Sequence, residues 1–188
     1  MSDAIKQNTN LDRRPEPDGN FPINYYRVPR DKYTFDSEKT REWVETRLSG
    51  RVLNSFAGEC FLNHDREIVR NDANPKRPAD YHVDAAELDE HLEHNSFDTI
   101  VHDPPWSNRQ AEKSYEGFQS GEVGKTMKAY NSLLKTGGCV ISLGYTVTVM
   151  PAKYSYERQE MAIFECIGRG DDYFGCIVKK MNSRLDAF

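Results

Sequence analysis

The stretch FDTIVHDPPW, residues 97–106, decides the fold of this 188-residue chain. Its first part is rich in apolar and β-branched residues and has the length of a strand, and the two prolines that follow cannot continue a hydrogen-bonded ladder. We therefore predict a strand over residues 97–102. Asp103, Pro104, Pro105 and Trp106 then stand directly after its end.

This tetrapeptide supplies a carboxylate, a rigid backbone carbonyl and a large flat ring in succession. The exocyclic amine of a planar heterocycle would donate hydrogen bonds to the Asp103 carboxylate and the Pro104 carbonyl, while Trp106 stacks on the ring. The four residues are therefore our candidate catalytic group. The alternative is a proline-stiffened turn in which Trp106 fills the core.

Strands and helices alternate on both sides of this stretch. The expected helices cover residues 36–48, with Asp36 or Ser37 as N-cap, 86–94, and 123–134, the last ended by the pair Gly137 and Gly138. The expected strands cover residues 51–56, 67–71, 81–83, 97–102, 139–143, 161–167 and 173–180. This alternation predicts an α/β fold whose sheet is mostly parallel and closes with a C-terminal antiparallel hairpin.

Ligands of such sheets bind at the carboxyl ends of the strands. The first expected strand ends in small residues, which allow a ligand to approach the backbone closely, and the next two end in the carboxylates Asp72 and Asp84. A carboxylate in this position is a natural partner for ribose hydroxyls or an adenine amino group. We therefore expect a nucleoside-containing cofactor, with an ordinary glycine turn as the alternative. The candidate binding residues at these strand ends are Asn54, Phe56, Ala57, Gly58, Glu59, Asp72 and Asp84.

The domain organisation follows from composition. Residues 1–20 are polar and contain two prolines, so we expect a flexible tail followed by a single domain over residues 21–188. The sequence has no run of about 18 apolar residues and no apolar signal core. We accordingly expect a soluble, cytoplasmic protein that does not contact a membrane.

No metal site is indicated. The four cysteines show no CxxC spacing, and His91 and His94 stand three residues apart with no third ligand in view. We expect neither zinc nor a disulfide framework, and a solvent-facing histidine pair.

The net charge of −5 is unevenly distributed. Residues 1–50 carry nine basic and nine acidic side chains, 51–106 carry five and twelve, and 107–188 carry eleven and nine, which gives 0, −7 and +2. A phosphate backbone would therefore avoid the middle third and bind the N-terminal segment or the last third. The candidate nucleic-acid contacts there are Arg109, Lys113, Lys125 and Lys153, and the alternative is a solvated helix face beside an ordinary lid loop.

Two motifs resemble those of a known family. VLNSFAG, residues 52–58, resembles the first motif of class I S-adenosylmethionine (SAM) dependent methyltransferases. The tetrapeptide at residues 103–106 resembles the catalytic motif of the amino-methyltransferases that modify adenine N6 or cytosine N4 in nucleic acids. The family implies a Rossmann-like, seven-stranded sheet with SAM as cofactor. The chain departs from the family where Glu59 and Cys60 replace a further glycine, and in the order of its two motifs.

The resemblance also implies roles for individual residues. Phe56, Ala57 and Gly58 would line the methionine end of SAM, while Asp72 would hold the ribose and Asp84 would lie near the adenine amine. Tyr33, Thr34 and Phe35 stand where the family has its N-terminal cofactor motif, which makes Thr34 and Phe35 cofactor-binding candidates.

The implied activity is methyl transfer from SAM to adenine N6, or to cytosine N4, with DNA as the expected substrate. Two alternatives stay open, namely the same chemistry on RNA and a non-catalytic subunit that binds nucleic acid or an active partner. Because the sheet occupies most of the chain, little remains for a separate target-recognition domain. We therefore expect a homodimer or a partner subunit to help recognise the target.

Overall fold

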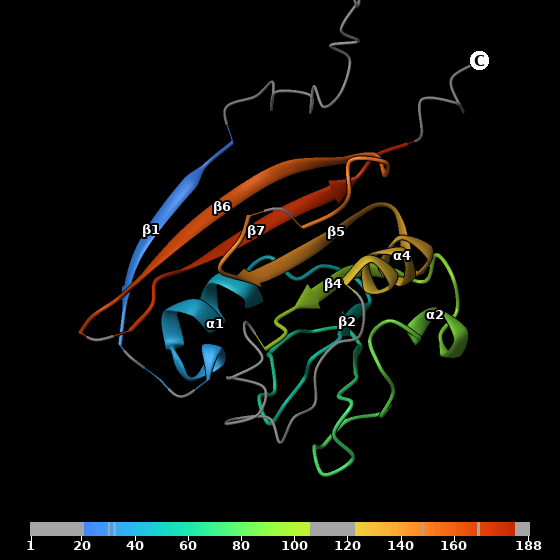
Figure 1. Ribbon diagram of the computed structural model, residues 1–188, viewed down its shortest axis with the longest axis horizontal. Coiled ribbons are helices and arrows are strands. Elements are labelled where there is room, and N and C mark those ends of the chain that lie inside the picture. The colour runs from blue at the N-terminus through green and yellow to red at the C-terminus, as the bar shows by residue number, and fades with distance from the viewer. Residues whose placement is uncertain are drawn as a thin grey trace, which may run out of the picture.

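Seven strands form one sheet in the order β1-β6-β7-β5-β4-β2-β3 (Figure 1). The computed structural model describes residues 21–29, 31, 33–105, 123–147, 149–168 and 170–182. The strands are β1 (Ile23–Val28), β2 (Val52–Asn54), β3 (Ile68–Arg70), β4 (Phe97–His102), β5 (Leu134–Gly144), β6 (Tyr156–Cys166) and β7 (Tyr173–Lys180). The described helices are η1 (Thr34–Asp36, a 3-10 turn), α1 (Glu38–Glu45), α2 (Leu88–His91) and α4 (Val123–Leu133).

The sheet is mostly parallel. Strand β7 runs antiparallel to its neighbours β5 and β6, and every other pair of neighbouring strands is parallel. The predicted α/β class and the C-terminal antiparallel hairpin are both confirmed. Strands β4 and β7 also have the predicted bounds.

Helices cover both faces of the sheet. On one face, α1 buries Trp43 and Val44 in a cluster that includes Ile141 and Phe164. On the other, α2 and α4 contribute Leu88, Met127 and Tyr130 to a second cluster with Ile100 and Val140. In Figure 1, α2 and α4 lie next to each other and apart from α1. The sheet is thus the middle of three layers, as the apolar character of β4 and β5 requires.

Local chemistry fixes the start of α1 and the entry into β2. The Ser37 hydroxyl accepts a hydrogen bond from the Thr40 backbone N–H, so Ser37 is the N-cap, one of the two residues predicted for that position. Gly50 has a φ of +57°, and a Cβ there would come within 2.3 Å of the Asp98 carboxylate. That carboxylate accepts from the Arg51 backbone N–H at 2.8 Å and from the Lys135 ammonium. Glycine is therefore required at the turn that leads into β2.

The seven strands are not the seven that the sequence predicts. Strand β1 was not predicted and extends the sheet by pairing with β6. The predicted strand over residues 81–83 is reduced to a single bridge between Asn71 and Tyr81, and the predicted helix over 86–94 is a single turn. Gly137 and Gly138 lie inside β5 rather than ending a helix, because the strand begins at Leu134 and a register shift opposite β4 accommodates them.

The links that follow β2 and β3 at the ligand edge are irregular. Residues 55–67 and 71–87, all of which the structure describes, contain no helix.

The predicted tail over residues 1–20 lies outside the described part of the chain. Among the described residues, no helix has the length and apolar character that crossing a membrane would require.

Candidate active site

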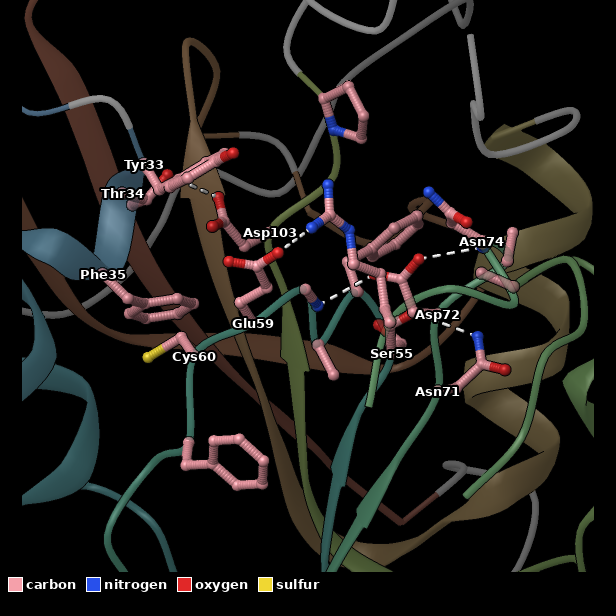
Figure 2. Close-up of a pocket in the computed structure, with 18 of the residues that line it drawn as sticks. Tyr33, Thr34, Phe35, Ser55, Glu59, Cys60, Asn71, Asp72, Asn74 and Asp103 are labelled. Carbon is pink, nitrogen blue, oxygen red and sulfur yellow. Dashed lines mark hydrogen bonds and ion pairs between the residues drawn. The ribbon is translucent and has the colours of Figure 1, made fainter. Parts of the chain in front are cut away.

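A cavity of about 450 Å³ lies where β2, β3 and β4 end. Its walls come from the segments that follow these three strands and from η1 and α1, and Figure 2 shows Tyr33, Thr34 and Phe35 on one side and Asp72 and Asn74 on the other. The lining residues are Tyr33, Thr34, Phe35, Asp36, Arg41, Ser55, Phe56, Ala57, Gly58, Glu59, Cys60, Phe61, Asn71, Asp72, Ala73, Asn74, Arg77, Val83, Ala85, Asp103 and Pro105.

The loop after β2 is held by the carboxylate that follows β3. Asp72 accepts a hydrogen bond from the Gly58 N–H at 2.8 Å through one oxygen and from the Asn74 N–H at 2.9 Å through the other. Gly58 has a φ of +51°, and the space where a Cβ would stand is open. The backbone at Gly58 is therefore accessible to a ligand, and Asp72 keeps further acceptor capacity on both oxygens.

Strand β4 delivers Asp103 into the same cavity. The Thr34 hydroxyl donates to an Asp103 carboxylate oxygen at 3.2 Å, which ties the 3-10 turn η1 to the end of β4. Phe35, only 5% exposed, anchors that turn in the core. Figure 2 shows this hydrogen bond as a dashed line between Thr34 and Asp103.

Charged side chains of both signs line the cavity. Carboxylates come from Asp36, Glu59, Asp72 and Asp103, and guanidinium groups come from Arg41 and Arg77. Arg77 forms an ion pair with Glu59, while Arg41 donates to the Phe35 carbonyl at 3.2 Å. With all of these groups ionised, the described residues of the lining carry a formal charge of −2.

A chain of buried polar groups lies between the cavity wall and α4. The Tyr130 hydroxyl is hydrogen-bonded to the Ser55 hydroxyl at 2.5 Å and to Nδ1 of His102 at 2.9 Å, and the Ser55 hydroxyl donates to the Val101 carbonyl. The His102 ring also packs edge-on against Phe56. Because Ser55 lines the cavity and His102 precedes Asp103, these hydrogen bonds connect the loop after β2 to the candidate catalytic residue.

The stability of the fold should depend on pH through His102. Removal from water lowers the pKa of this imidazole from 6.5 to about 4. Between these values the unfolded chain binds a proton that the folded chain does not, so stability falls as pH drops through this window. We expect a loss of about 1–2 kcal/mol between pH 7.5 and pH 5, measured by urea unfolding.

His102→Gln should remove that part of the pH dependence, and His91→Gln on the exposed surface of α2 is the matched control. An unchanged pH dependence in His102→Gln would contradict the assignment.

The structure brings most of the predicted site residues into one cavity. The predicted residues that line it are Thr34, Phe35, Phe56, Ala57, Gly58, Glu59, Asp72, Asp103 and Pro105. Asn54 and Pro104 do not belong to the lining, since Asn54 is buried within β2. Asp84 lies outside the lining as well, and its carboxylate accepts from the Ala86 backbone N–H at 2.9 Å.

The predicted nucleic-acid contacts are only partly described. Arg109 and Lys113 lie outside the described residues, as does Trp106 of the candidate catalytic group. Lys125 is exposed on α4, and the Lys153 ammonium lies 5.1 Å from the centre of the Tyr154 ring.

Several lining residues were not assigned roles from the sequence, chiefly Arg41, Arg77 and Asn74. Arg77 follows Asp72 in a link bounded by prolines at the ligand edge, which is a weak positional signal. Arg41 belongs to a helix whose approach to the cavity depends on tertiary packing.

Among the described residues, no group of three or more His, Cys, Asp or Glu side chains is arranged to hold a metal ion. All four cysteines are free thiols, and burial raises the pKa of Cys60, which lines the cavity.

Comparisons with known proteins identify the fold. No protein-family model and no curated protein sequence matches this chain. Among solved structures, TrmN from Thermus thermophilus aligns with a TM-score of 0.55 at 16% identity over 76% of this chain and 48% of that one. This chain therefore spans about half the length of TrmN.

Two further structures carry the name methyltransferase. A 1,6-didemethyltoxoflavin-N1-methyltransferase from Burkholderia thailandensis, with bound 1,6-didemethyltoxoflavin and S-adenosylhomocysteine, has a TM-score of 0.54 at 11% identity and covers 77% of this chain and 78% of its own. A SAM-dependent methyltransferase from Archaeoglobus fulgidus has a TM-score of 0.50 at 13% identity and covers 74% and 94%. The chain thus has the Rossmann-like fold that these SAM-dependent methyltransferases share.

Proposed function

We propose that this protein is a SAM-dependent methyltransferase that acts on an exocyclic amine of a nucleobase, adenine N6 in DNA above all. One observation carries the proposal. Asp103 and Pro105, at the end of β4, line the same cavity as Gly58 and Asp72, at the ends of β2 and β3. A group suited to an amine therefore faces a cavity suited to a nucleoside cofactor.

The residues of the cavity fit SAM. A volume of about 450 Å³ lies within the usual range for small-molecule sites. Asp72 has acceptor capacity for ribose hydroxyls, and the open backbone at Gly58 suits the methionine part. The net negative lining suits a cofactor that carries net positive charge. We leave Asp84 out of the proposed contacts because it is not one of the residues that line this cavity.

When bound, SAM supplies an electrophilic methyl group on its sulfonium sulfur. The amine of a nucleobase is a weak nucleophile because its lone pair is delocalised into the ring. Hydrogen bonds from the amine to the Asp103 carboxylate and the Pro104 carbonyl would favour a pyramidal nitrogen and hold its lone pair toward the cavity. Positioning of this kind is worth about 7–11 kcal/mol in well-oriented reactions.

A target base in a duplex must first leave the stack, at a cost of a few kcal/mol. In our proposal Trp106 stacks on the extruded base and offsets part of that cost. Arg109, Lys113, Lys125 and Lys153 would contact phosphates, and a second copy or a partner chain would add recognition surface. Those roles rest on residue type and on the position of these residues in the sequence.

The test is transfer of a labelled methyl group from SAM to double-stranded DNA and, in parallel, to RNA, followed by nucleoside analysis. We expect labelled N6-methyladenosine from the DNA arm, as the deoxynucleoside. Label only in the RNA arm would move the proposal to RNA, and label only on cytosine N4 would change the base. No transfer to either polymer would favour a non-catalytic subunit.

A further inference from the structure

We propose that the charges of Glu59 and Arg77 act in opposite directions on the preference of the cavity for SAM over its demethylated product, S-adenosylhomocysteine: Glu59 favours SAM and Arg77 disfavours it. The inference rests on the proposed function and deepens it by assigning a specificity role to two residues. Neither residue is assigned to the chemical step.

The pair belongs to the cavity itself. Both residues line it, Glu59 on the loop after β2 and Arg77 in the link after β3. The Arg77 side chain is 16% exposed and the Glu59 side chain is 65% exposed, so the arginine lies in the wall and the glutamate reaches it from the solvent side. Figure 2 shows the pair as a dashed line that leaves the Glu59 carboxylate.

Cofactor and product differ by one unit charge. SAM carries a sulfonium, an ammonium and a carboxylate, for a net charge of +1, whereas S-adenosylhomocysteine has a neutral thioether and a net charge of 0. Their shapes otherwise differ by one methyl group. The ammonium and the carboxylate are common to both molecules, so a change in the net charge of the cavity alters the affinity for SAM relative to the affinity for the product.

Substitution of Glu59 or of Arg77 changes the net charge of the cavity, and the two substitutions change it in opposite directions. Without the Glu59 charge, the partly buried Arg77 guanidinium loses its anion and repels the sulfonium. Without the Arg77 charge, the Glu59 carboxylate is left to attract it. If the pair had only a structural role, each substitution would instead lower the affinity for SAM and the affinity for S-adenosylhomocysteine together.

The experiment is isothermal titration calorimetry of SAM and of S-adenosylhomocysteine on the full chain and on Glu59→Gln, Arg77→Gln and the double variant. The measured quantity is the ratio of the product Kd to the SAM Kd. We expect about a threefold fall of this ratio in Glu59→Gln and about a threefold rise in Arg77→Gln. The double variant should return to within about twofold of the wild type.

The matched control is Glu67→Gln. Glu67 forms an ion pair with Arg51 and is 61% exposed, similar to Glu59, but it does not line the cavity. Its ratio should equal that of the wild type. Thermal melting accompanies each titration, and if one single variant does not fold, the direction measured for the other tests the proposal independently.

Two failures are distinguishable. If the wild-type chain binds neither ligand, the proposed function falls and this inference falls with it. If the wild-type chain binds both ligands and the two substitutions leave the ratio unchanged or move it the same way, only the charge-selection role is overturned.

Discussion

Asp103→Asn is expected to lower the kcat of methyl transfer about 1,000-fold, an effect of the size seen when one preorganised hydrogen-bonding group is removed from a reacting centre. The substitution keeps the size of the side chain but removes the negative charge that accepts from the target amine. The Thr34 hydroxyl, which donates to Asp103 at 3.2 Å, also loses an ionised acceptor. Initial rates with labelled SAM and a DNA duplex measure the effect.

The loss should appear in turnover rather than in cofactor affinity, with the Kd for SAM changed by less than about tenfold. Asp65→Asn is the control because this aspartate is exposed and lies outside the cavity. A turnover of Asp103→Asn within about threefold of the wild type would show that the catalytic group has been misplaced.

Asp72→Ala is expected to weaken SAM binding about 100-fold. The substitution removes the acceptor of the Gly58 and Asn74 backbone N–H groups as well as the proposed ribose contact. Leaving such groups without a partner costs about 1–3 kcal/mol, and the lost ligand contacts add to it. The SAM Kd of Asp72→Asn should lie between those of the wild type and Asp72→Ala, because an amide offers one acceptor oxygen where the carboxylate offers two. Calorimetric titration of SAM measures each Kd.

Asp84→Ala is the informative comparison. Like Asp72, Asp84 accepts a hydrogen bond from the backbone N–H of the residue two positions later in the sequence, but it does not line the cavity. We expect its SAM Kd to stay within about threefold of the wild type. Equal losses in the two variants would indicate that both act through loop structure or that both contact the cofactor, and would contradict the assignment of the ribose to Asp72 alone.

The sequence was most informative where local pattern and tertiary environment agree. Strand β4 has the predicted bounds because its apolar run is buried on both faces and two prolines end it. Strand β1 was missed because it forms an edge and depends on pairing with β6, more than 130 residues further along the chain. Its residues Ile23 and Tyr25 are about 60% exposed, so they give little sign of a buried strand.

The prediction for Gly138 is wrong because the role of this glycine depends on contacts between strands. Gly138 was expected to end a helix, but a Cβ there would lie 2.9 Å from the Asp98 carbonyl, so the residue permits close approach between β5 and β4. In the site, too, local pattern finds only part of the residues. Asp72 and Asp103 were found because each follows a strand, whereas Arg41 and Arg77 enter the cavity through packing that no local pattern records.

Calorimetric titration of SAM into the wild-type chain tests the central claim most directly, because every proposed role depends on the cavity at the ends of β2, β3 and β4. We predict saturable 1:1 binding with a Kd of roughly 1–100 μM, which corresponds to about 5–8 kcal/mol. A folded chain that gives no binding signal with SAM at roughly millimolar concentration, a Kd weaker than about 1 mM, would contradict the account.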